Sequence, residues 1–244
     1  MKAMIFAAGL GTRLKPLTDT MPKALVPVAG RPLLYHIAHK IIGSGISDIV
    51  INTHHFAGMI EDYVREQEGF GASVSISHEA DELLETGGGI LHARRFLEGS
   101  GRFLVHNVDI ISNLDIRWFL SQVKDDALST LVVSGRESSR YLLFDDDMRL
   151  VGWTNAKTGE VRSPFPGLNP DGCRRLAFSG IHCMSDRVFA EMEALGMSGR
   201  FSIIDFYLAA AATCPIYGVV PPALHLLDVG KVGALAEAEK LLSL

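Results

Sequence analysis

A glycine-containing segment near the start of the chain has the residue types of an anion-binding loop. It runs Ala8-Gly9-Leu10-Gly11-Thr12-Arg13, directly after an apolar stretch. Glycines placed after a strand let the backbone come close to a ligand, and the free N–H groups of such a loop bind anionic oxygens. Arg13 adds a planar group that suits phosphate, and Lys23 adds a second cation ten residues later. The segment therefore predicts a loop that holds a triphosphate from several sides.

Other glycine loops fit these residues less well. The dinucleotide-binding fingerprint needs a third glycine where this sequence has Leu14, and an acidic residue at the end of the next strand, where Asn52 lies. A Walker-type loop needs Gly-Lys-Ser/Thr after the glycines, and the segment lacks it. A plain strand-to-helix turn explains the glycines but gives no reason for the two cations. The pattern favours phosphate binding.

Asp109 is the first candidate metal ligand. It follows the apolar run Phe103-Leu104-Val105, which has the composition of a buried strand. The carboxyl end of a central parallel strand is where such sheets bind ligands, and magnesium is usually held by one or two carboxylates with phosphate oxygens and water. An isolated aspartate after a strand also serves as a turn former or cap. In register with the anion loop, Asp109 is predicted to bind magnesium.

A second glycine cluster, Thr86-Gly87-Gly88-Gly89, precedes a predicted helix. A flat nucleobase and ribose can lie against backbone at Gly87 and Gly88, where a Cβ would clash. Three glycines at a helix start also cost stability, which favours a ligand role. For Thr86 alone, a role as the helix N-cap is equally consistent with the pattern.

The elements that position these residues follow an α/β pattern. Short runs rich in Val and Ile alternate with segments of helical period, as in βαβ units with a largely parallel sheet. Strands are predicted at residues 3–8, 49–51, 74–76, 103–105 and 130–133, with helices over about 32–42 and 57–68. These strands form the centre of a predicted doubly wound sheet.

The second half of the chain adds a different pattern. Two short strands within 141–155 flank the acidic turn Asp145-Asp146-Asp147, which predicts an antiparallel hairpin added to the parallel core. A loop over 162–172, a strand over 176–184, helices near 187–195 and 203–212, a strand over 216–220 and a closing helix near 232–242 follow. No linker or repeat separates the halves, so we expect a single domain over 1–244.

Composition limits the class of protein. Forty-eight per cent of the 244 residues are hydrophobic, and the net charge of −5 has the wrong sign for holding nucleic acid. A phosphorylated ligand therefore needs a local cluster of donors. Cys173, Cys183 and Cys214 form no C-x-x-C pair, which favours reduced thiols over disulfides or zinc. No segment has the length of a bilayer span or the pattern of a signal peptide, so we expect a soluble, cytoplasmic protein without membrane contact.

The first motif is similar to that of a known family. The run from Gly9 to Thr18, followed by Pro22-Lys23-x-Leu25-x-Pro27-Val28-x-Gly30-x-Pro32, resembles the signature of the sugar-1-phosphate nucleotidyltransferases. The resemblance implies a Rossmann-like, glycosyltransferase-A-like sheet. It also implies a magnesium-dependent reaction in which a nucleoside triphosphate and a sugar 1-phosphate give a nucleoside-diphosphate sugar and pyrophosphate.

The resemblance further implies roles for individual positions. Nucleotide contacts are expected from Ala8, Gly9, Gly11, Thr12, Arg13, Lys23, Gly87, Gly88 and Asn107. Sugar contacts are expected from Glu85, Thr86, Ser179 and Gly180. Arg13, Lys23 and Asp109 are the expected catalytic residues, and Asp109 and Asp228 are the expected magnesium ligands.

Some positions depart from the family pattern. The family usually has Gly-Asp where this chain has Val108-Asp109, which puts the local backbone geometry in question. Leu227 and Lys231, on either side of Asp228, also differ from the commonest pattern. Capping of the closing helix is the alternative role for Asp228.

Two features narrow the choice of substrates within the family. They are the segment Leu84-Glu85-Thr86-Gly87-Gly88-Gly89 and the compact length of the chain. Both are most similar to N-acetylmuramate 1-phosphate uridylyltransferases of cell-wall recycling, which favours UTP. Mannose-1-phosphate guanylyltransferases come next, then glucose-1-phosphate thymidylyl- or uridylyltransferases. The sequence shows no hexapeptide-repeat β-helix of the kind bifunctional relatives carry. A catalytically inactive nucleotide-sugar-binding regulator is the alternative of another class.

Overall fold

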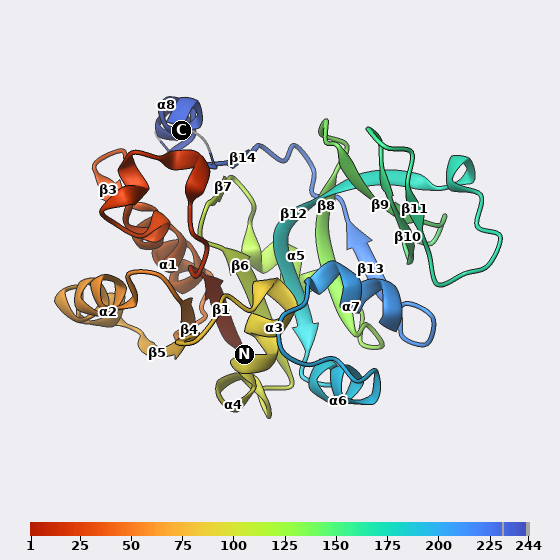
Figure 1. Ribbon diagram of the computed structural model, residues 1–244, viewed down its shortest axis with the longest axis horizontal. Helices are drawn as coiled ribbons and strands as arrows, with labels where there is room; N and C mark the ends of the chain where they lie inside the picture. The colour runs from red at the N-terminus through yellow and green to blue at the C-terminus, as the bar shows by residue number, and fades with distance from the viewer. Residues whose placement is uncertain (231, 243–244) are drawn as a thin grey trace.

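The computed structural model describes residues 1–230 and 232–242, and a mixed β-sheet runs through its centre (Figure 1). The strands are β1 (Lys2–Phe6), β2 (Pro27–Val28), β3 (Arg31–Pro32), β4 (Asp48–Thr53), β5 (Ser73–His78), β6 (Arg102–Asn107), β7 (Ile110–Ser112), β8 (Ser129–Ser134), β9 (Arg140–Phe144), β10 (Leu150–Asn155), β11 (Val161–Arg162), β12 (Arg174–Ser185), β13 (Ile216–Val219) and β14 (Leu226–Asp228). The central order is β5-β4-β1-β6-β12-β8-β13. Every predicted strand of the first half is present.

Helices cover both faces of this sheet. They are α1 (Leu33–Gly43), α2 (Ala57–Glu66), α3 (Glu85–His92), α4 (Arg94–Leu97), α5 (Ile116–Ser121), α6 (Val188–Ala194), α7 (Ile203–Ala210) and α8 (Leu235–Leu242). Successive residues of β1 point to opposite faces, so Ala3 and Ile5 pack in the core under α1, α2, α5 and α8, whereas Met4 packs under α3, α4, α6 and α7. The predicted doubly wound α/β fold is confirmed.

The seven central strands of the sheet are mostly parallel. β1 pairs in parallel with β4 and β6, and β4 with β5, which matches the runs of apolar residues expected of strands buried on both faces. The long strand β12 lies between β6 and β8 and is antiparallel to both. An apolar pattern carries no information on strand direction, so this inversion could not be predicted.

The predicted hairpin is also confirmed. β9 and β10 pair antiparallel, and β11 extends them as a third strand, at the right of Figure 1. The first residues of β12, Arg174 to Leu176, pair with β9, whereas its later residues pair with β6 and β8. One long strand therefore joins the antiparallel strands to the parallel core.

A small pairing near the C-terminal end was not predicted. β14 pairs antiparallel with β7, which directly follows Asp109, and a short 3-10 turn over Val232–Ala234 leads into α8.

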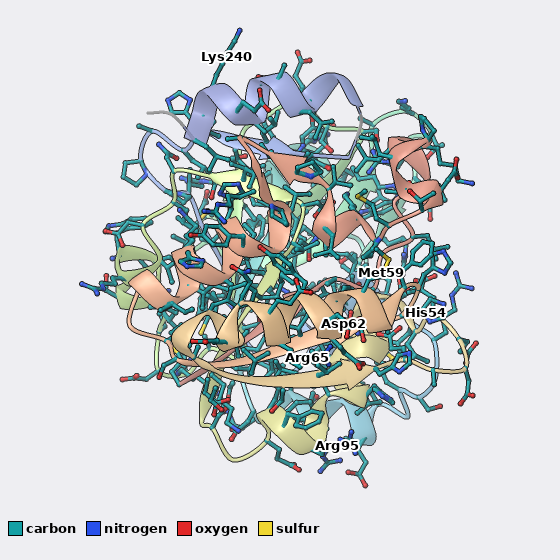
Figure 2. All side chains as sticks on the ribbon, turned by 90° about the vertical axis from the view of Figure 1, so that its left-hand side faces the viewer. His54, Met59, Asp62, Arg65, Arg95 and Lys240 are labelled. Atoms are coloured by element: carbon teal, nitrogen blue, oxygen red, sulfur yellow. The ribbon has the colours of Figure 1, made fainter. Side chains whose placement is uncertain are left out.

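Figure 2 views the molecule from the α2 side and shows Asp62 and Arg65 pointing outward from that helix. In the described ranges, no helix is both long enough and apolar enough to cross a membrane.

Candidate active site

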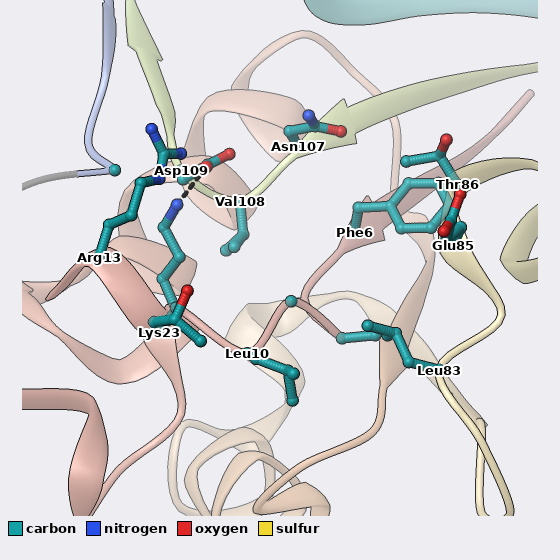
Figure 3. Close-up of a pocket in the computed structure, with 15 residues that line it drawn as sticks. Phe6, Leu10, Arg13, Lys23, Leu83, Glu85, Thr86, Asn107, Val108 and Asp109 are labelled. Atoms are coloured by element: carbon teal, nitrogen blue, oxygen red, sulfur yellow. Dashed lines mark hydrogen bonds and ion pairs between the residues drawn. The ribbon is translucent and has the colours of Figure 1, made fainter. Parts of the chain in front are cut away.

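A cavity of about 460 Å³ opens where β1 and β6 end (Figure 3). Its lining is Phe6, Ala8, Gly9, Leu10, Gly11, Thr12, Arg13, Lys23, Leu83, Glu85, Thr86, Asn107, Val108, Asp109 and Gly230. The carboxyl ends of parallel strands meet at this edge, where open α/β sheets bind ligands. The volume lies within the range of small-molecule sites. Most of the predicted nucleotide-binding residues are brought together here.

The anion loop has a conformation that requires glycine. Gly11 has φ +62°, and a Cβ at this position would lie 2.9 Å from Cγ2 of Thr18. The Thr18 hydroxyl donates a hydrogen bond to the Gly11 carbonyl at 2.8 Å, which fixes the turn. Among the described residues, no hydrogen bond to the protein is donated by the backbone N–H groups of residues 9–13. These groups are available to phosphate oxygens.

Lys23 and Asp109 form an ion pair inside the cavity. Lys23 begins a 3-10 turn, Lys23–Leu25, and is only 8% exposed. Its Nζ donates a hydrogen bond to Oδ2 of Asp109, the dashed contact in Figure 3. Because water is largely excluded from both side chains, the charges are screened less than those of a surface pair. The pair places a cation and a carboxylate where substrate phosphates would enter.

Val108 does not disturb this arrangement. Its N–H donates to the Phe6 carbonyl at 3.0 Å and so continues the pairing of β6 with β1. Its φ is not positive, so the position has no conformational need for glycine. The departure from the family pattern leaves Asp109 in contact with Lys23.

The pairing of β7 with β14 brings Asp228 close to Asp109 and Arg13. Asp228 is opposite Ile110, and the N–H of Val229 donates to the Asp109 carbonyl at 2.8 Å. Nη2 of Arg13 lies 3.9 Å from Oδ2 of Asp228. Asp228 thus ends a strand and does not cap the closing helix. Lys231, the other departure from the family pattern, lies outside the described residues.

The residues present fit a magnesium ion. Asp109 directly precedes β7 and Asp228 ends β14, the antiparallel partner of β7, and each faces a cation, Lys23 or Arg13. The described part of the chain contains no group of three or more His, Cys, Asp or Glu residues that could hold a metal alone. Two carboxylates suffice for magnesium when substrate phosphates and water complete its octahedron. The donor set therefore matches magnesium bound together with a phosphate substrate.

Gly87 and Gly88 are placed differently from the prediction. Both are buried in α3 and do not line the cavity. A Cβ on Gly87 would lie 2.4 Å from the Phe201 ring, and one on Gly88 would lie 2.3 Å from the Gly199 carbonyl oxygen. Their N–H groups donate to the Phe201 carbonyl. Close packing of α3 is therefore sufficient to explain glycine at both positions, and their contact with a nucleobase stays a prediction.

The two residues before these glycines do line the cavity. Glu85 has φ +61°, an uncommon conformation for a side chain other than glycine, and its carboxylate pairs with Arg200 at 2.8 Å. The Thr86 hydroxyl accepts from the N–H of Ile203 at 2.9 Å. Thr86 therefore holds the start of α7 and is not the N-cap of α3, whose cap is Leu84.

The remaining predicted sugar residues lie behind the wall of the cavity. Asn107 lines it, and a Cβ on Gly180, which has φ +70°, would lie 2.7 Å from Nδ2 of Asn107. The buried Ser179 hydroxyl has no hydrogen-bond partner in the described part of the chain. Gly180 thus lies against Asn107, and neither Ser179 nor Gly180 lines the cavity. The apolar or small lining residues Phe6, Leu10, Leu83 and Gly230 were missed because they carry no chemical signal in the sequence.

Two histidines are buried in the strands beneath the site. Burial lowers the pKa of His106 to about 4 and that of His182 to about 3. His106 Nδ1–H donates to the Asn107 carbonyl at 2.8 Å, and His182 forms a hydrogen bond with the Tyr207 hydroxyl. Both rings are neutral at pH 7, so among the described residues the cations that line the cavity are Arg13 and Lys23.

Comparisons with known proteins show which family this chain is similar to. The family model described as nucleotidyl transferase matches residues 2–142. N-acetylmuramate alpha-1-phosphate uridylyltransferase of Caulobacter vibrioides is 32% identical over 250 residues, which cover 99% of this chain and 96% of that protein. Mannose-1-phosphate guanylyltransferase catalytic subunit beta of Xenopus tropicalis is 39% identical over 113 residues, which cover 46% of this chain and 31% of that protein.

The solved structure of a UDP-glucose pyrophosphorylase with UDP-glucose is similar to this chain, with a TM-score of 0.77 at 17% sequence identity. The match covers 99% of this chain and 98% of that chain, and it supports the fold. The family model spans more than half of the chain, and the Caulobacter protein matches it over almost its whole length. The chain therefore belongs to the nucleotidyl transferase family, among the sugar-1-phosphate nucleotidyltransferases.

Proposed function

We propose that this chain is the uridylyltransferase that joins UTP and N-acetylmuramate 1-phosphate, with magnesium, in cell-wall recycling. The carrying observation is that Arg13, Lys23 and Asp109 line one cavity at the carboxyl edge of the sheet, and that Asp228, which is not part of the lining, lies beside Arg13. The similarity to the Caulobacter uridylyltransferase over almost the whole chain supports the choice of substrates.

The reaction is a direct displacement at phosphorus. An oxygen of the sugar 1-phosphate attacks the α-phosphorus of the nucleoside triphosphate and forms a new P–O bond. The bond to the β-phosphate bridging oxygen breaks, and its electron pair leaves with pyrophosphate. A phosphate monoester dianion is already nucleophilic, so the reaction needs no protein nucleophile. Catalysis then rests on positioning and on neutralising negative charge.

The residues of the cavity divide this work. The unpaired N–H groups of residues 9–13 and the Arg13 guanidinium bind the β- and γ-phosphates, which become the leaving group. Lys23 is held by Asp109 at a fixed place and neutralises charge near the α-phosphate. Glu85, Thr86 and Asn107 line the rest of the cavity, where nucleoside and sugar hydroxyls would bind.

Asp109 and Asp228 are the residues that would hold magnesium. When bound, the ion neutralises phosphate charge and draws the two substrates together. Asp109 also orients the Lys23 ammonium, and Asp228 orients the Arg13 guanidinium. Each carboxylate therefore positions a cation in addition to its metal role.

Pyrophosphate release, measured for every pairing of five nucleoside triphosphates with four sugar 1-phosphates, tests the proposal. The triphosphates are UTP, GTP, CTP, dTTP and ATP, and the sugars are N-acetylmuramate, mannose, glucose and N-acetylglucosamine. We expect the highest rate with UTP and N-acetylmuramate 1-phosphate, and no rate above background without a divalent cation. Nucleotide binding without release from any pair would contradict the proposal and favour an inactive regulator.

A second candidate is mannose-1-phosphate guanylyltransferase activity. It is supported by the 39% identity to the Xenopus enzyme, which covers less than half of this chain. The same measurement separates the two. The highest rate with GTP and mannose 1-phosphate would replace the first proposal by the second.

A further inference from the structure

A buried pair of side chains links two segments that line the cavity. Asn52 lies near the end of β4 with no exposed surface, and Glu79 directly follows β5 and is 2% exposed. β4 and β5 are parallel neighbours, so their carboxyl ends bring the two side chains together. Nδ2 of Asn52 donates a hydrogen bond to Oε1 of Glu79.

Each end of this link holds a backbone N–H group. Oδ1 of Asn52 accepts from the N–H of Ala8 at 3.2 Å, at the start of the anion loop. Oε2 of Glu79 accepts from the N–H of Leu84 at 2.8 Å. Leu84 lies between Leu83 and Glu85, which both line the cavity. The two side chains therefore connect the anion loop to the segment 83–86.

Glu79 is an unusual residue at this buried position. In the described part of the chain it forms no ion pair with a Lys, Arg or His side chain. A buried carboxylate is costly unless hydrogen bonds compensate it, and here both oxygens accept an N–H. A Cβ on Gly89 would lie 2.7 Å from Oε1, so α3 packs directly on the carboxylate. The surroundings hold this side chain in a single place.

We propose that Glu79, acting through Asn52, is a positioning residue that sets the distance between the anion loop and the segment 83–86. A nucleoside triphosphate contacts both parts of the cavity at once, so a change in this distance weakens its binding even in a folded protein. The inference rests on the proposed function, because it takes a nucleoside triphosphate as the ligand.

Glu79→Gln is the decisive substitution because it keeps the size and changes the charge and the hydrogen-bonding groups. Glu79 must accept from two donors, whereas glutamine accepts at one oxygen and presents an NH₂ group at the other position. That NH₂ group would face either the Leu84 N–H or the Asn52 amide, donor against donor. One end of the link is therefore lost.

The double variant Asn52→Asp with Glu79→Gln restores the link. The glutamine oxygen accepts from Leu84, and its NH₂ group donates to the new aspartate. The other aspartate oxygen accepts from Ala8, as Asn52 does now. Charge and number of hydrogen bonds equal those of the original chain. Rescue by the double variant, in a double-mutant cycle, is a result that simple loss of packing cannot give.

The measurement is equilibrium binding of UTP with magnesium, with GTP in parallel, at a temperature where circular dichroism shows every variant folded. We expect Kd to rise about tenfold in Glu79→Gln, the effect of one lost hydrogen bond. Asn52→Asp should weaken binding similarly, and the double variant should return to within about threefold of the original. Glu98→Gln, the same change on the surface, should bind as the original chain does.

Two results would overturn the role of Glu79. One is an unchanged Kd in Glu79→Gln with only a lower unfolding temperature, and the other is a double variant that stays as weak as the single ones. If Glu79→Gln does not fold, Glu79→Asp takes its place, because it keeps the charge and loses the reach to one partner. Failure of the original chain to bind either nucleotide would instead count against the proposed function.

Discussion

Asp109 and Asp228 differ in how far the sequence pattern alone predicts their positions in the structure. Both were predicted as metal ligands, but only Asp109 follows a strand that its own sequence pattern predicts. Asp228 is preceded by a three-residue strand, too short to produce a recognisable alternation of apolar and polar residues. The resemblance to a family pointed to Asp228, whereas the elements around it indicated a helix cap.

Replacing either aspartate by asparagine is expected to remove most turnover and to leave the fold intact. The change removes a negative charge that faces a cation and would hold magnesium, and we expect a loss of about two orders of magnitude or more. Asp228→Asn is the cleaner variant, because that side chain is 47% exposed. Pyrophosphate release at saturating magnesium measures the effect. Asp62→Asn, on the outer face of α2 in Figure 2, is the control, and rates like the original in either site variant would contradict the assignment.

Lys23→Ala is expected to lower turnover about a hundredfold or more, the scale of removing one preorganised charge. The substitution also leaves Asp109 without its partner. Single-turnover kinetics with saturating nucleotide would measure the chemical step. Lys15→Ala changes an exposed lysine outside the cavity, so its rates should match those of the original chain. A Lys23→Ala variant that loses only thermal stability would show a structural role.

At the scale of elements, the parallel strands and the β9–β10 hairpin were predictable, whereas the short antiparallel pairs β2–β3 and β7–β14 were not. A strand such as β1, buried on both faces, reads as an unbroken apolar run, and the segment that follows it carries the predicted loop. For the glycines of α3, the sequence alone did not predict which atoms lie beside them. Glycine permits close approach to a ligand or to another part of the chain, and only the structure shows that Phe201 and Gly199 occupy the space.

Gly88→Ala is therefore expected to destabilise the fold. The new methyl group would meet the Gly199 carbonyl, and overpacking of this kind costs about 1–3 kcal/mol in the free energy of unfolding. Gly58→Ala is the matched control, because Gly58 lies in the exposed part of α2 with open space around it. The change Gly58→Ala should raise the free energy of unfolding by about 0.5–1 kcal/mol. Urea denaturation of both variants checks the contrast, which would vanish if α3 packed loosely.

At the scale of the whole molecule, the buried histidines make stability depend on pH. Folding holds His106 and His182 neutral down to about pH 4 and 3, whereas the unfolded chain protonates both near pH 6.5. The contribution of the two histidines to the free energy of unfolding is therefore fully present above about pH 6.5. It is lost as the pH falls toward 4, because the unfolded state then binds more protons than the folded state. Each histidine should cost about 2 kcal/mol between pH 7 and pH 5.

Urea denaturation at several pH values between 7 and 5 measures this loss. His182→Asn should reduce the slope of stability against pH, whatever its effect on stability at pH 7. His55→Asn changes an exposed ring and should leave the slope as it is. A free energy of unfolding that stayed constant across this range in the original chain would show that the rings are protonated inside the fold.

The pairing of β14 with β7 also has a consequence for how the enzyme is made. Asp228 is translated 119 residues after Asp109 (228 − 109), which takes roughly 6–24 s at common rates of synthesis. During that interval the nascent chain already contains the anion loop, Lys23 and Asp109. It lacks the second carboxylate and the strand that pairs with β7. The ribosome thus completes the residues that we propose to bind phosphate before Asp228, the second proposed magnesium ligand.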